Sequence, residues 1–90
     1  MAALDLLGRR WALRILWELR DGPVGFRDLR IRCDEMSSSV LSARLAELTA
    51  AGLVAKDDDE RHTLTPIGRD LGLAIEPLTA WAATWATTHP

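Results

Sequence analysis

The sequence lacks the hallmarks of several protein classes. Its single Cys, Cys33, excludes an internal disulfide and any zinc site built from several cysteines. It has no long apolar run and no secretory signal pattern, so we expect a cytoplasmic protein without a membrane partner. Its two histidines, His62 and His89, are far apart, and it has no nucleophile–base pattern and no Gly-rich phosphate loop. We therefore expect no enzyme, no metal site and no cofactor.

Positive charge is scarce as well. The net charge is −2, and almost every basic residue is an Arg. The balance changes along the chain, because residues 1–50 hold eight Arg against seven acidic residues, whereas residues 51–90 hold three basic against six acidic residues. A polyanion is bound by a basic patch and not by a basic total, so the composition leaves nucleic-acid binding open.

The chain does have enough apolar residues for one small domain over residues 1–90. Hydrophobic residues make up 48% of the sequence, which predicts a thin core. Domains of this size often gain stability by pairing. Four Trp and no Tyr in so short a chain indicate extra apolar surface.

The clearest helix signal covers residues 36–52. Ser37 is a good N-cap, because its hydroxyl can accept from an amide that the first turn leaves unpaired, and Gly52 supplies a stop. The core-facing side of this helix is predicted to carry Leu41, Leu45 and Leu48. The opposite side carries small residues: Ser39, Ser42, Ala43 and Ala46.

Helical spacing also predicts an N-terminal helix over residues 1–21 and a short helix from Phe26. Gly8 weakens the first turns, so a short break can occur there, and Gly22–Pro23 ends the helix. Residues 26–52 are then two helices joined by a tight turn, as in a helix-turn-helix.

From residue 53 the pattern changes period. Residues 53–65 predict a β-hairpin wing, to which Val24–Gly25 can add a short third strand. Residues 66–88 predict a final helix, and Pro77 inside it predicts a kink or break near Glu76. The fold class is mainly α (α+β): a winged helix-turn-helix with a short two- to three-stranded wing and a long or kinked C-terminal helix.

Several motifs follow each other at the spacing of a known family. Residues 8–16, Gly-Arg-Arg-Trp-Ala-Leu-Arg-Ile-Leu, resemble the signature Gly-Gly-Lys-Trp-Thr-Leu-Leu-Ile-Leu of the HxlR-type bacterial transcriptional regulators, which are relatives of the MarR group. Residues 22–29 and 64–68 resemble the family's Gly-Pro-x-Arg-Phe-x-Glu-Leu and Leu-Thr-x-x-Gly elements. The resemblance implies a homodimeric repressor or activator of palindromic operator DNA, with the N- and C-terminal helices in the dimer contact.

Three departures qualify what the resemblance implies. The family usually has a Cys ahead of its Gly-Lys-Trp element, used for redox sensing in some members. Residues 1–7 contain no Cys and Cys33 lies elsewhere, so this redox role does not carry over. The wing is shorter, with His62 at the usual Tyr position. Its tip, residues 57–60, is acidic where a DNA-contacting wing should be neutral or basic.

The start of the helix over residues 37–50 is the predicted DNA-contacting surface. Its hydroxyls can donate to phosphates, helped by the amides and dipole of the helix start. The alternative is that Ser37 caps the helix and the other hydroxyls are solvated. The exposed face has no Arg, Asn or Gln for bidentate base readout, although an Ala can contact a thymine methyl. The residues assigned to DNA here are Ser37, Ser38, Ser39, Ser42 and Ala43.

Five arginines are further candidates. Arg27, Arg30 and Arg32 lie on the helix that borders the DNA backbone in this fold, or else are solvated beside neighbouring acids. Arg44 can reach a phosphate or pair with an acidic group of its own domain. Arg61 can enter a minor groove, but the four adjacent acids favour an ion pair with one of them.

Two reactive side chains receive structural assignments. His62 is interpreted as a strand residue of the hairpin, with pH sensing as the alternative. Cys33 has the helical spacing of Phe26 and Leu29, which predicts a buried core residue. The alternative, a reactive thiol, needs an electropositive and partly exposed site.

A second apolar stripe predicts a dimer interface, because a surface helix of a monomer needs only one such stripe. Flat rings between subunits can instead bind a planar hydrophobic effector. The residues assigned to the interface are Leu6, Leu13, Trp17, Leu78, Trp81 and Trp85.

The sequence therefore predicts a DNA-binding transcriptional regulator whose helix 37–50 docks in the major groove as a homodimer. Two alternatives stay open. One is a winged-helix protein-interaction or oligomerisation module with weak or no DNA binding, which the acidic wing favours. The other is an effector-responsive regulator with a planar hydrophobic ligand near the Trp residues.

Overall fold

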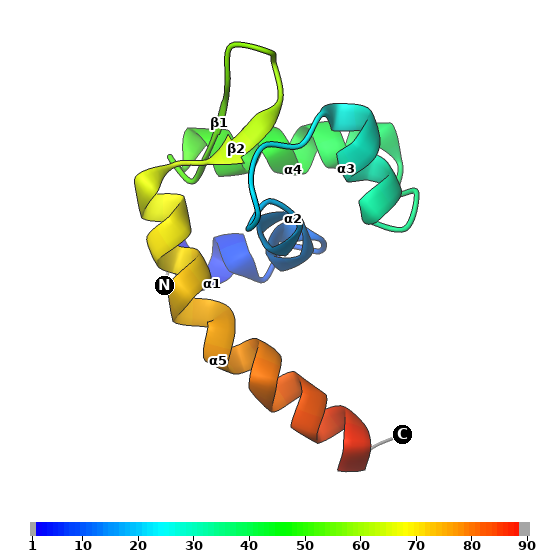
Figure 1. Cartoon of the computed structure of the whole chain (residues 1–90), viewed down its shortest axis with the longest axis vertical. Helices are drawn as coiled ribbons and strands as arrows, with labels where there is room; N and C mark the ends of the chain where they lie inside the picture. The colour runs from blue at the N-terminus through cyan, green and yellow to red at the C-terminus, as the bar shows by residue number, and fades with distance from the viewer. Residues whose placement is uncertain (1, 89–90) are drawn as a thin grey trace.

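The winged helix-turn-helix architecture is confirmed by a computed structural model that describes residues 2–88 (Figure 1). The remaining residues, Met1, His89 and Pro90, and the expectations that fall on them, lie outside the described part. In chain order the elements are α1 (Ala2–Leu7), α2 (Ala12–Glu18), α3 (Phe26–Arg32), α4 (Ser38–Ala50), β1 (Val54–Lys56), β2 (His62–Leu64) and α5 (Pro66–Thr88). The longest dimension is 43 Å, with the wing at one end and the C-terminal half of α5 at the other.

The N-terminal helix is divided into two at Gly8, where the sequence allowed a short break. The Gly8 amide donates to the Leu4 carbonyl at 2.8 Å and closes α1, and Trp11 then adopts a left-handed φ of 78° before α2 begins. The loop between them is held from a distance, because Arg44 of α4 donates to the Arg10 carbonyl at 3.0 Å. The break follows the weak helix propensity of Gly8, and a contact from a distant part of the chain then holds the loop.

The core lies between α2, α3, α4 and the wing. Leu41 and Leu48 are fully buried, which confirms the core-facing side predicted for α4. Fully burying a Leu side chain contributes about 1.5–3 kcal/mol. Cys33 is also fully buried, and burial raises the pKa of its thiol, so the structure supports the core assignment and not a reactive thiol.

Both ends of α4 have the expected caps. The Ser37 hydroxyl accepts from the Val40 amide at 3.3 Å. At the other end Gly52 adopts a left-handed φ of 78°, and the Leu53 amide donates to the Leu48 carbonyl at 3.0 Å. These bonds satisfy terminal backbone groups and fix the length of the helix.

The wing is a two-stranded antiparallel hairpin in which Val54 pairs with Leu64 and Lys56 with His62. The expected third strand is a single residue, since Val24 and His62 exchange two backbone hydrogen bonds of 2.8 Å. His62 is 7% exposed, and burial followed by the charge of Lys56 lowers the pKa of its imidazole. The structure therefore makes it a buried strand residue.

Of the kink or break predicted near Glu76, the break is absent, because α5 is continuous through Pro77. Its axis changes direction in the middle (Figure 1). Proline removes one backbone bond and crowds the preceding turn, and this half of the helix is exposed, so it can bend without losing core contacts. Among the described residues, no helix is both long and apolar enough to cross a membrane.

Candidate nucleic-acid interface

The surface with the geometry of a DNA-reading site is the outer face of α4. One side of this helix is locked into the core by its three leucines. The other side is exposed and carries only small groups, which leave room for close approach to a ligand. These exposed residues are Ser38, Ser39, Ser42, Ala43 and Ala46.

The hydroxyl groups cluster at the N-terminal end of α4. Ser37 caps the helix, and its Oγ lies 2.8 Å from the Oγ of Ser39. The positive end of the helix dipole coincides with these exposed hydroxyls, an arrangement that favours phosphate oxygens. The structure thus gives Ser37 the capping role and leaves Ser38 and Ser42 exposed beside it.

The arginines of α3 are not equivalent. Arg27 and Arg32 are exposed, whereas Arg30 is partly buried and its Nε donates to the Met36 carbonyl at 2.8 Å. Arg30 therefore braces the turn between α3 and α4. Figure 1 shows α3 beside α4, the helix that carries the serines.

Arg44 and Arg61 bind within the chain. Arg44 donates to Glu47 at 2.8 Å, which matches the ion-pair alternative for this residue. Arg61 pairs with Asp57 at 3.2 Å and with Asp59 at 3.5 Å, as the acidic neighbourhood favoured. The Arg61 backbone amide, with that of Asp59 and the Arg61 guanidinium, holds the pKa of Asp57 below its usual value. The tip of the wing is thus neutralised only in part.

Sequence reasoning missed Arg14 of α2. Its side chain bonds to Glu18 at 2.9 Å and to Asp34 at 3.3 Å. The spacing to Glu18 was visible as an i, i+4 pair. The contact with Asp34, twenty residues away, depends on how α2 packs against α3.

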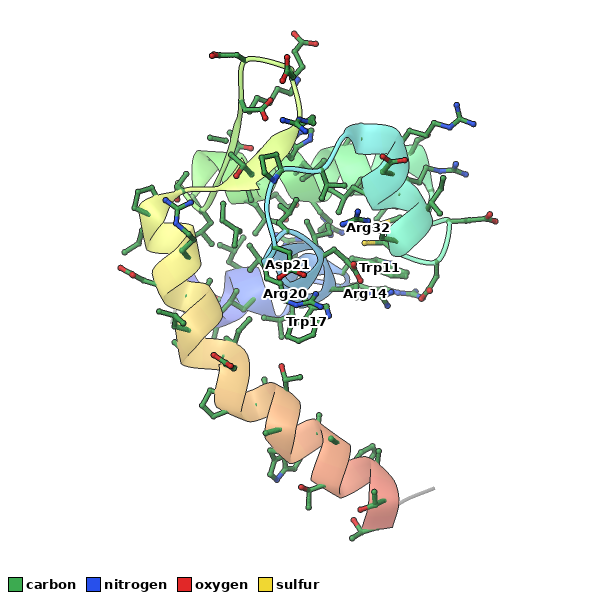
Figure 2. The ribbon with its side chains drawn as sticks, viewed as in Figure 1. Trp11, Arg14, Trp17, Arg20, Asp21 and Arg32 are labelled. Carbon is green, nitrogen blue, oxygen red and sulfur yellow. The ribbon has the colours of Figure 1, made fainter. Side chains whose placement is uncertain are left out.

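The six residues assigned to the dimer interface lie around α1, α2 and α5. Leu6, Leu13 and Trp17 are half-buried, and Trp17 lies on the side of α2 that faces α5 (Figure 2). On α5, Trp81 is 59% exposed, and its ring stacks on that of Trp85 at a centroid distance of 6.4 Å. Leu78 is 49% exposed. The helix thus presents large apolar groups far from α4.

The structure places α4 after a short helix, α3, and before a wing, with its leucines in the core and its serine-rich start exposed. This arrangement defines a helix-turn-helix protein that binds DNA. The family model described as HxlR-like helix-turn-helix matches residues 6–90, and the chain belongs to that family. Family membership makes it a helix-turn-helix transcriptional regulator, as the resemblance of residues 8–16 implied.

Individual relatives agree. The chain is 30% identical over 89 residues to YvaP of Bacillus subtilis, an uncharacterized HTH-type transcriptional regulator, covering 92% of this chain and 82% of the relative. The fold of this chain matches that of quinone-bound YodB from B. subtilis with a TM-score of 0.82 and 32% sequence identity, and the match covers 92% of each chain. It matches a possible HxlR family transcriptional factor from Thermoplasma volcanium with a TM-score of 0.84 and 27% identity, covering 93% and 81%. These relatives are named as regulators and not as enzymes.

Proposed function

We propose that two copies of this chain form a cytoplasmic homodimer that docks each α4 into a major groove of a palindromic operator. The observation that carries the proposal is the exposed start of α4, where hydroxyls and the positive helix end coincide on a helix fixed by its leucines. A two-fold dimer then sets the half-sites about one helical turn, roughly 34 Å, apart.

The contacts divide into two groups. Ser38, Ser39 and Ser42 bind phosphates from α4, and Arg27 and Arg32 do so from α3. The second group holds the site in shape and does not contact DNA, because each side chain already bonds to a group of its own chain. This group consists of Arg30, Ser37, Arg44 and Arg61. Ala43 can contact a thymine methyl, and DNA shape with half-site spacing supplies the remaining selectivity.

Exposed apolar side chains on α5 support dimerisation through α5 and α2. The C-terminal half of α5 has no buried residue among the described positions, and it carries the exposed side chains of Leu78, Trp81 and Trp85. Exposed apolar groups of this size mark an interaction surface. A second copy of the same helix can cover them by isologous contact.

Selection of DNA sites from a random pool, followed by anisotropy titration of the selected duplex at several salt concentrations, tests the proposal. We expect a two-fold symmetric site, a stoichiometry of two chains per duplex and an affinity that falls with salt. Absence of salt-sensitive binding would instead favour the protein-interaction module, for which the acidic tip of the wing is suited.

A second candidate function is response to a planar hydrophobic effector. A groove of about 660 Å³ lies between α2, β2 and α5, with Trp17 and Leu64 among its lining residues. The similar protein YodB is described as quinone-bound. Titrating simple quinones while following Trp fluorescence tests this candidate, and an unchanged signal at all concentrations argues against it.

A further inference from the structure

One side chain ties α2 to the turn between α3 and α4. The Arg14 Nε donates to Glu18 Oε2 at 2.9 Å, Nη1 donates to Asp34 Oδ2 at 3.3 Å, and Nη2 donates to the Arg32 carbonyl. Figure 2 shows Arg14 extending from α2 toward the end of α3. A guanidinium offers five donors in a planar fork, so one group can hold three acceptors at once.

The acceptors are in a turn that needs support. Asp34 and Glu35 have left-handed φ angles of 60° and 56°, a conformation that costs free energy for residues with a Cβ. On one side of the turn Arg14 holds Asp34 and the last carbonyl of α3. On the other side the Arg30 Nε holds the Met36 carbonyl. Of these bonds, those of Arg14 come from a different helix.

The turn leads directly into the reading surface. Ser37, the cap of α4, follows Glu35 by two residues, so a shift of the turn moves the start of α4 with it. The signature that residues 8–16 resemble has Leu where this chain has Arg14, and a Leu cannot donate to any of these acceptors.

Arg14 also borders a second feature. With Leu13 and Trp17 it lines one wall of a cleft of about 320 Å³, and Ile75 and Leu78 of α5 line the other. The Glu18 carboxylate, 16% exposed, raises the pKa of Arg14 through its hydrogen bond and orients the guanidinium from within α2. The same side chain therefore contacts both the α5 side of the molecule and the turn before α4.

We propose that Arg14 is a positioning residue for DNA recognition, which fixes the start of α4 to α2 by holding the turn at Arg32 and Asp34. This inference rests on the proposed function, because it assumes that α4 contacts DNA. Its test uses amide exchange of residues 33–38, which reports on the turn whether or not DNA is bound. The salt-dependent titration of the unmodified protein tests DNA binding separately.

The decisive variant is Arg14→Gln, with Arg20→Gln as the matched control. Arg20 lies close to the end of the same helix, but its hydrogen bond goes to the nearby Trp17 carbonyl and its ion pair to the adjacent Asp21. We expect Arg14→Gln to speed exchange at residues 33–38 and to weaken operator binding about three- to tenfold, while the core of α4 stays protected. Arg20→Gln should leave the exchange at residues 33–38 unchanged.

Arg14→Lys provides a milder version if Arg14→Gln does not fold. Its single ammonium keeps the charge but cannot match the planar fork, so exchange in the turn should still quicken. Two results would overturn the proposal. One is unchanged turn exchange in the variant that folds. The other is equal acceleration in every helix, which would make Arg14 a general stabiliser of the fold.

Discussion

The winged-helix head, residues 12–65, and the tail formed by α5 use apolar residues in opposite ways. In the head the large apolar groups of α2 and α4 close around one core, and Leu41, Leu48 and Ile15 are fully buried. In the tail only Gly68 is buried among the described residues, and Leu73 and Trp81 are 69% and 59% exposed. The head therefore encloses the apolar core, whereas the tail leaves its large apolar side chains exposed.

The two regions also differ in charge. The head contains most of the arginines, and several of them bond to carbonyls or carboxylates within it, as Arg14, Arg30 and Arg44 do. From residue 76 to residue 88, α5 carries one acidic residue, Glu76, and no basic residue. A tail without charge repulsion suits contact between identical subunits.

The largest effect should come from the head core. Leu48→Ala removes a fully buried side chain and is expected to lower the free energy of unfolding by about 2–5 kcal/mol. Leu73→Ala, at an exposed tail position, should change it by less than about 0.5 kcal/mol. Urea unfolding followed by circular dichroism compares the two, and equal losses would remove the distinction between head and tail.

Assembly should depend on the tail. Trp81→Glu places a charge among the exposed apolar groups of α5 and should weaken the dimer by about 2 kcal/mol or more. In a monomeric sample of the Trp81→Glu chain, the free energy of unfolding of the head should remain close to that of the parent chain. Sedimentation equilibrium gives the mass, and an unchanged dimer constant would count against the α5 interface.

The junction between the two regions gives the next effect. A Cβ on Gly68 would lie 2.2 Å from the Leu53 carbonyl oxygen, so Gly68→Ala must push α5 away from the wing. We expect a loss of about 1–3 kcal/mol. Gly72→Ala, one turn later, meets nothing within 4 Å and should gain up to about 1 kcal/mol from helix propensity. Thermal melts of both variants measure these changes in stability. If Gly68→Ala and Gly72→Ala changed the melting temperature in the same direction, the close packing at residue 68 would be refuted.

The smallest effect concerns pH. Because burial lowers the pKa of His62 in the folded head, the unfolded chain takes up its proton first as the pH falls below 6.5. Stability should therefore decline on acidification from that point, and His62→Gln should flatten the decline. Asp57, whose pKa is also lowered, contributes a loss only below about pH 4, so it does not mask the change. Identical melting-temperature profiles for both chains between pH 7 and 5 would contradict this assignment.

Features set by local pattern were predictable from the sequence. The Ser37 cap, the leucine face of α4 and the Gly52 stop need only the period of a helix and the chemistry of its ends, and each is present. The pairing of Arg61 with the acids of its own turn was favoured for the same reason, since the partners are four residues apart or closer.

Features set by distant contacts were not predictable. The break at Gly8 was anticipated from its low helix propensity, but the bond that Arg44 makes to the Arg10 carbonyl in that loop, thirty-four residues away in sequence, was not. The roles of Arg14 and Arg30 depend on carbonyls of the α3–α4 turn, which no spacing pattern reveals. At Pro77 the sequence pattern left a kink and a break both open. The helix is continuous there, because an exposed helix can bend at a proline without losing core contacts.

The central claim, that the start of α4 binds DNA phosphates, is tested most directly by Ser39→Asp. A carboxylate in the first turn of a helix stabilises it through the dipole but repels a phosphate, so fold and binding should respond in opposite directions. We expect a melting temperature equal to or above that of the parent chain, with operator affinity lowered by about tenfold or more at low salt. Unchanged affinity for the selected operator in this folded variant would contradict the account.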